Sequence, residues 1–215
     1  MVVLARSVRE RKNTRMNISI ASYAFHGLVR DGAIDVFGYL ESCRYRYDLR
    51  TADIWNGMLQ STEKDYLAKV KQALTERELT LVNLCVDGPH VWEDDPDRRE
   101  KHYQGALKWL DAAEYLGAKT LRIDAGVRED TFTPEQLEGI ITRFREYAQR
   151  AHDSGFRVGP ENHWGAELDP ANMRAIYDGV DHPGFGVLLH LRDNDINTAL
   201  APMAMHTHIS WEITS

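Results

Sequence analysis

A repeating pattern constrains the fold of this chain more than any other feature of its sequence. After Met16, a short apolar run is followed by a loop, a helix with a capping signal, a glycine and another short apolar run. This alternation is typical of parallel strands joined by helices, because each helix returns the chain to the end of the sheet where the next strand begins. Composition does not shift along the pattern, so we expect residues 16–215 to form one α/β domain.

Seven runs fit the strands of such a domain. Most are rich in Val, Ile and Leu, as strands covered on both faces should be. The second run fits least well, because it contains Arg50 and Asp53. The predicted strands span residues 17–21, 49–55, 80–86, 120–124, 156–161, 185–190 and 205–210.

The helices between these runs have marked ends. Thr133-Pro134-Glu135-Gln136 combines an N-cap, a proline at the first helical position and the glutamine of a capping box. Asp95-Pro96 and Asp169-Pro170 repeat the first two of these signals. A glycine in the left-handed conformation commonly ends a helix. Three glycines precede predicted strands and are expected to act in this way: Gly117, Gly155 and Gly179.

A doubly wound sheet would also fit seven strands. That fold usually carries a glycine-rich phosphate loop after its first strand, and residues 22–27 (SYAFHG) contain no GxGxxG motif. We therefore predict a TIM-barrel-like (β/α) repeat with about seven parallel strands, an incomplete (β/α)8 barrel. In a barrel, functional groups gather at the C-terminal ends of the strands.

Composition limits the cellular setting and the partners. The formal net charge of −7 disfavours a nucleic-acid partner, which normally requires clustered Lys and Arg. No apolar run is long enough to cross a membrane. The two cysteines, Cys43 and Cys85, are expected to be reduced thiols, and we predict a cytoplasmic protein without a membrane partner.

The first fifteen residues are basic and lack the apolar stretch of a secretion signal. We interpret residues 1–15 as a disordered extension, or as the product of a start codon upstream of Met16. A nucleic-acid-binding arm is the alternative.

Histidines and carboxylates gather at the predicted strand ends. Because these ends converge at one mouth of a barrel, mixed carboxylate and imidazole groups there predict a divalent metal site. Such an ion can hold two sugar oxygens while a carboxylate moves a proton between carbons. The residues at or just beyond the strand ends are His26, Asp87, His90, Asp124, Glu161, His163, His190, Asp193, His206 and His208.

Each of these residues also has a structural interpretation. Glu161 could form a buried ion pair, and His190 could be a core histidine with satisfied hydrogen bonds. Trp164 and the other tryptophans near the strand ends could pack in the core or form a wall against a sugar ring. Three further histidines are expected on the solvated surface: His102, His152 and His182.

Four segments together resemble the xylose isomerase-like TIM-barrel superfamily, which includes sugar phosphate isomerases and epimerases and endonuclease IV. The resemblance extends over nearly the whole chain from Met16. The segments are Leu121-Arg122-Ile123-Asp124, Pro160-Glu161-Asn162-His163-Trp164-Gly165, residues 182–189 (HPGFGVLL) and His206-Thr207-His208.

The resemblance implies a metal ion, Mn, Co or Zn, held by Glu161, His190 and His208. His190 stands where the epimerases of the superfamily have Asp, which favours a softer ion such as Zn. Glu161 is also the implied proton-transferring base. Glu167 matches a glutamate that contacts substrate, and Asp193 stands where the epimerases have a substrate-contacting histidine. The remaining candidate substrate contacts are His26, His163 and Trp164.

The chain departs from the superfamily after its seventh predicted strand, because the eighth strand and its metal-binding Glu are absent from residues 1–215. Glu212 is one possible substitute. We expect open edges on the first and seventh strands, and hence a homodimer or a poorly soluble chain. The leading hypothesis is a metal-dependent sugar isomerase or epimerase acting on a ketose or cyclic polyol. A non-catalytic remnant that binds metal or sugar is the alternative, and endonuclease IV-like DNA repair is disfavoured by the acidic charge.

Overall fold

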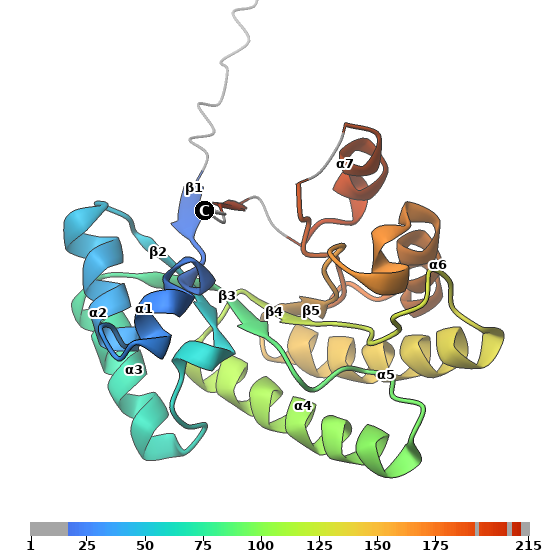
Figure 1. Cartoon of the computed structure of the whole chain (residues 1–215), viewed down its shortest axis with the longest axis horizontal. Helices are drawn as coiled ribbons and strands as arrows, with labels where there is room; N and C mark the ends of the chain where they lie inside the picture. The colour runs from blue at the N-terminus through green and yellow to red at the C-terminus, as the bar shows by residue number, and fades with distance from the viewer. Residues whose placement is uncertain (1–16, 192–193, 206–207, 212–215) are drawn as a thin grey trace, which may run out of the picture.

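Four parallel strands form the main sheet of the protein. A computed structural model of the chain describes residues 17–191, 194–205 and 208–211 (Figure 1), so the predicted extension at 1–15 lies outside the described residues. The strands are β2 (Thr51–Trp55), β3 (Thr80–Val86), β4 (Thr120–Ile123) and β5 (Arg157–Gly159), adjacent in chain order. Parallel strands with helical connections confirm the predicted TIM-barrel-like fold.

Helices cover the outside of these strands. Figure 1 shows α2 to α5 wrapped around one side of the sheet, with α6 and α7 beyond β5. Among the described helices, none is long and apolar enough to cross a membrane. The helices are α1 (His26–Arg30), α2 (Val36–Glu41), α3 (Lys64–Glu76), α4 (Pro96–Leu116), α5 (Pro134–Asp153), α6 (Pro170–Val180) and α7 (Asn194–Leu200).

The helix boundaries follow the predicted signals with one exception. Thr133 forms the full capping box of α5, and Asp95 and Asp169 cap α4 and α6. Gly117 ends α4 in the left-handed conformation, with φ at 74°. The prediction for Gly179 was wrong.

Gly179 lies inside α6, and Asp181 takes the left-handed position instead, with φ at 43°. A Cβ at Gly179 would overlap the side chain of Ile141 on α5. This glycine therefore permits close approach of two helices, and it does not end a helix.

The first and last described strands pair with each other. Strand β1 (Asn17–Ile20) runs parallel to β6 (His208–Trp211), and an isolated bridge from Ala21 to Asp53 joins β1 to β2. The expectation of open edges on the first and seventh strands was wrong where the two strands meet, since they pair with each other there. The pairing removes our reason for expecting a homodimer, and the oligomeric state stays a prediction.

The predicted strand at 185–190 is present only as isolated bridges. Gly186 donates its N–H to the Val158 carbonyl, and Leu188 donates to the Pro160 carbonyl at 2.8 Å. Pro160 has no N–H to give in return, so a continuous ladder with β5 cannot form there. The prediction of a regular strand was wrong for this reason. The seventh strand, predicted for 205–210, begins at His208, and residues 206–207 lie outside the described part.

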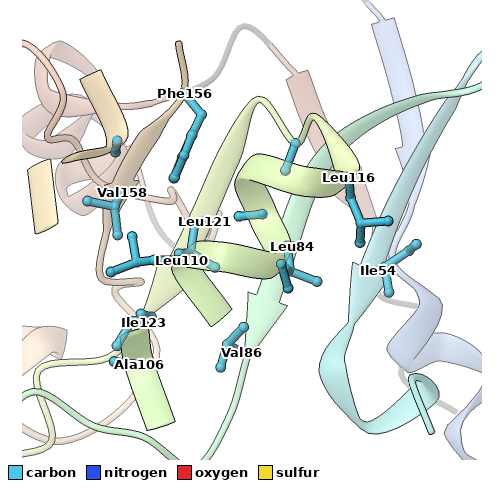
Figure 2. Close-up of a cluster of buried hydrophobic side chains, with 14 of the residues drawn as sticks. Ile54, Leu84, Val86, Ala106, Leu110, Leu116, Leu121, Ile123, Phe156 and Val158 are labelled. Atoms are coloured by element: carbon cyan, nitrogen blue, oxygen red, sulfur yellow. The ribbon is translucent and has the colours of Figure 1, made fainter. Parts of the chain in front are cut away.

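The two faces of the sheet differ sharply in polarity. Side chains of β2 to β5 that point outward form an apolar core with the covering helices, and Figure 2 shows Leu84, Leu121 and Val158 among them around Leu110 of α4. The inward face is polar. It holds Asp53, whose presence made the second strand the weakest prediction; Arg50 lies just before β2 and pairs with Glu78 at the surface.

We predict that Gly159→Ala destabilises the fold by about 3 kcal/mol, because a Cβ there would overlap the backbone carbonyl of Gly186. Urea denaturation would measure the loss. Gly27→Ala is the matched control. Gly27 lies in α1, and a Cβ at this position would meet no neighbouring atom within 4 Å, so the substitution should leave stability unchanged or raise it slightly. Equal effects at the two positions would contradict the prediction.

Candidate active site

Side chains on the inward face of the sheet form rows across neighbouring strands, and the row at the C-terminal ends forms the site. Asp53, Asn83 and Thr120 align across β2, β3 and β4. Asn83 donates to Asp53 at 3.1 Å and accepts from the Thr120 hydroxyl at 2.9 Å. One row nearer the C-terminal ends, Arg122 lies beside Gly159. Since side chains two residues apart on a strand share a face, the next inward positions carry carboxylates. These are Asp87, Asp124 and Glu161.

The Arg122 guanidinium joins the three carboxylates. Its side chain is 5% exposed, and its Nη1 lies 2.8 Å from both Asp87 and Asp124. Its Nε lies 3.3 Å from Oε2 of Glu161. A buried cation is costly unless charged partners surround it. Here one positive group faces three negative ones, so the cluster retains a net negative charge.

Glu161 is held at both carboxylate oxygens. Oε1 lies 3.0 Å from Nδ1 of His190, and Oε2 faces Arg122 and, at 3.5 Å, Nδ1 of His163. Burial by itself raises the pKa of Glu161. The hydrogen bond from His190 and the charge of Arg122 outweigh burial and lower the pKa below its usual value. Glu161 is therefore an ionised carboxylate at neutral pH, as a base or a metal ligand must be.

A side chain places His190 beside Glu161. The Asn162 amide accepts from the His190 N–H at 2.7 Å and donates to the His190 carbonyl at 3.0 Å. This pair of bonds replaces the main-chain ladder that Pro160 interrupts. It fixes the backbone of residue 190 against the end of β5.

His163 and Trp164 lie on the other side of Glu161. The His163 ring is nearly parallel to that of His190, with centroids 6.4 Å apart. Trp164 donates its indole N–H to Asp124 at 3.1 Å. Both predicted substrate contacts therefore adjoin the carboxylate cluster.

Glu167 lies beneath this cluster and is completely buried. Its Oε1 accepts the Ala125 N–H at 2.7 Å. Burial raises the pKa of Glu167 well above its usual value, and the nearby charge of Asp124 raises it further. Its carboxyl group is therefore held in the protonated form to a higher pH than an ordinary glutamate.

The other predicted residues are distributed around the mouth. His26 is exposed and stacks on Tyr23, whose ring meets the edge of Trp55. Trp55 donates to Asp87 at 2.7 Å, so His26 is linked through Tyr23 and Trp55 to the carboxylate cluster. Asp193 and His206 lie outside the described residues. The backbone of His208 starts β6, but its side chain is outside the described part.

His102 was expected on the solvated surface, and that expectation was wrong. Its side chain is only 19% exposed, its ring lies 5.6 Å from that of His90, and its Nδ1 is 3.6 Å from Glu93. The apolar pattern of α4 gives no signal for this contact, because the loop after β3 folds back over the helix. His152 and His182 pack on each other near the surface.

The described donors suit a divalent ion in chemistry, because Mn, Co and Zn accept mixed carboxylate and imidazole ligands. The hydrogen bond of 3.0 Å between Oε1 of Glu161 and Nδ1 of His190 holds these two side chains next to each other. The net negative charge around Arg122 would also be offset by a dication. Within the described residues, no group of three or more His, Cys, Asp or Glu side chains is arranged to hold a metal, so these two are a partial set.

The family of the chain follows from its sequence match. The family model of the xylose isomerase-like TIM barrel matches residues 46–193. The chain belongs to this family. A comparison with the curated proteins finds no match.

Solved structures share the fold of this family member. The probable 3-DHS dehydratase AsbF, involved in petrobactin synthesis in Bacillus anthracis, has a TM-score of 0.71 at 17% identity, covering 89% of this chain and 72% of that one. D-psicose 3-epimerase with D-tagatose, from Clostridium cellulolyticum H10, has a TM-score of 0.68 at 14% identity, with 88% and 71% covered. A xylose isomerase-like TIM-barrel protein from Mycobacterium smegmatis in complex with magnesium has a TM-score of 0.61 at 13% identity, with 88% and 72% covered.

Sequence reasoning missed two residues of the site. Arg122 interrupts an otherwise apolar strand, and a charge there requires buried partners, so the sequence did carry a signal for it. Asn162 carries no comparable signal, because its role depends on the absence of an N–H at Pro160 two residues earlier.

We predict that Glu167→Gln changes the pH dependence of stability. The native protein binds the Glu167 proton more tightly than the unfolded chain, so the wild type loses stability as pH rises above about 4.3, the ordinary value for Glu. The amide avoids this loss. Urea denaturation should give the variant the larger free energy of unfolding at pH 8, and the difference should shrink toward pH 4.5. Glu100→Gln, at an exposed position of α4, is the control with no such trend. A pH-independent difference for Glu167→Gln would refute the prediction.

Proposed function

We propose that the protein is a metal-dependent isomerase or epimerase that acts on a ketose or cyclic polyol by proton transfer. The observation that carries the proposal is the ionised, mostly buried carboxylate of Glu161 beside His190 at the C-terminal end of β5. A base in this position is shielded from water and lies where barrel enzymes bind their substrates.

Glu161, His190 and His208 are the proposed ligands of a Mn, Co or Zn ion. When bound, such an ion polarises a substrate carbonyl and so acidifies the adjacent C–H group. Glu161 accepts the proton from that carbon. Delivery of that proton to the neighbouring carbon, with the hydroxyl proton passing to the other oxygen, gives isomerisation. Delivery of a proton from a second donor to the opposite face of the same carbon gives epimerisation.

The proposed substrate contacts surround this base. His163 and Trp164 lie on one side of Glu161, where an imidazole and an indole ring can bind hydroxyl groups and the face of a sugar ring. Asp193 and His26 complete the proposed set, whereas Glu167, predicted as a substrate contact, is completely buried and supports the cluster from below. Both cysteines are free, in keeping with the reducing cytoplasm as the proposed location.

The activities of two structural relatives are compatible with this chemistry. One is an epimerase and the other a probable dehydratase. Loss of a proton beside a carbonyl can begin either reaction, so the proposal concerns this shared step first. Binding of metal or sugar without turnover is the second candidate, and the partial ligand set among the described residues favours it.

We predict about one transition-metal ion per chain after incubation with Mn, Co or Zn and removal of excess metal. Glu161→Ala should lose most of this metal, because it removes the one carboxylate among the proposed ligands. Glu100→Ala, which removes an exposed carboxylate of α4, should keep it. Elemental analysis of the three proteins measures the result. Equal metal content in all three would place the ion elsewhere.

We also predict that the protein incorporates deuterium from D2O into a ketose at the carbon beside the carbonyl. Glu161→Gln should slow incorporation at least about 100-fold, since general-base catalysis contributes this much or more. Mass spectrometry of a panel of ketoses and keto-polyols would follow the exchange. Bound metal without any exchange would favour the binding-only candidate over the enzyme.

A further inference from the structure

The three guanidinium nitrogens of Arg122 all face groups of the protein. Its Nη1 donates to the Val86 carbonyl as well as to Asp87 and Asp124, and its Nη2 donates to Cys85. Its remaining nitrogen, Nε, faces Glu161 at ion-pair distance, 3.3 Å from Oε2, without a hydrogen bond. An arginine buried to this extent does not bind an anionic substrate group, so its function must be exercised through its neighbours.

The local packing keeps the guanidinium beneath Glu161. The neighbour of Arg122 on β5 is Gly159, which has no side chain to fill the space between them. On the other side, Cys85 aligns with Arg122 and contacts it. The guanidinium is therefore held between strands β3 and β5, at the level just below the three carboxylates.

This placement distinguishes the two oxygens of Glu161. Oε2 faces Arg122, and Oε1 faces His190. If the carboxylate rotated, Oε1 would lose His190 or Oε2 would lose the buried cation. The planar guanidinium can donate to Asp124 through Nη1 while its Nε faces Glu161, because its nitrogens form a rigid fork, which the single ammonium group of a lysine lacks.

From this geometry we propose that Arg122 is a positioning residue that turns Oε1 of Glu161 toward His190 and thereby sets the metal affinity of the site. The proposal rests on the proposed function. A purely structural role, in which Arg122 only neutralises buried carboxylates, would require its charge but not its shape.

Arg122→Lys separates these roles, because it keeps the positive charge and removes the fork. Titration of Mn²⁺ into the full chain by isothermal calorimetry should show about 10- to 100-fold weaker binding, the usual effect of losing a residue that orients a ligand. Arg77→Lys is the matched control. Arg77 is also mostly buried and ion-paired, to Glu41 at 3.0 Å, but it lies at the end of α3, outside the strands. The Arg77→Lys variant should bind Mn²⁺ with an affinity within about twofold of the wild-type value. The substitution keeps the charge, and no proposed ligand touches residue 77.

Wild-type affinity in Arg122→Lys would overturn the proposal, and so would an equal loss in both variants. If the lysine variant does not fold, as judged by circular dichroism, the double variant Arg122→Gln with Asp124→Asn replaces it. This pair keeps the net charge of the cluster but takes the facing cation from Glu161, so weaker Mn²⁺ binding is again expected, and wild-type affinity would overturn the proposal.

A wild type that binds no Mn²⁺ would count against the proposed function, and the positioning role would then be decided by crystal structures. Oε1 of Glu161 turned away from His190 in Arg122→Lys would uphold it. Oε1 still on His190 would overturn it.

Discussion

The burial of one guanidinium determines how the interior of this protein is organised. Arg122 lies inside the strands with three carboxylates around it. Each carboxylate comes from the end of a different strand, so the charge can be satisfied only when β3, β4 and β5 are in register. Removing one partner of such a cluster costs about 3 to 5 kcal/mol, because an uncompensated charge stays buried. The same contacts that align the strands therefore also align the candidate base.

Much of the scaffold could be predicted from local signals. The capping box at Thr133, the aspartate caps and the left-handed Gly117 depend on residues a few positions apart, and the structure has them all where the sequence indicated. The gathering of Asp124, Glu161 and His190 at one edge was also predictable, since it requires only parallel strands and the positions of their ends.

The features that sequence reasoning missed depend on contacts between distant segments. Gly179 resembles a helix stop, but its neighbour Ile141 lies on another helix. The interrupted strand at 185–190 depends on Pro160, which belongs to the preceding element. Which atoms of Glu161 face Arg122 and which face His190 is likewise a matter of three-dimensional packing. The order of residues along the chain contains no direct information on this orientation.

The Asn162 side chain has a consequence for how the site can change. In a continuous sheet, the register of a strand is fixed by many main-chain bonds, and no single substitution can release it. The segment that carries His190 has main-chain bonds to β5 and Pro160 at Gly186 and Leu188, and beyond them the backbone of residue 190 is bonded to the Asn162 amide. The protein thus combines a rigid frame of four strands with an adjoining wall whose end, at His190, is bonded to a side chain. Substrate preference can diverge by altering that wall while the frame, and the base it holds, stay as they are.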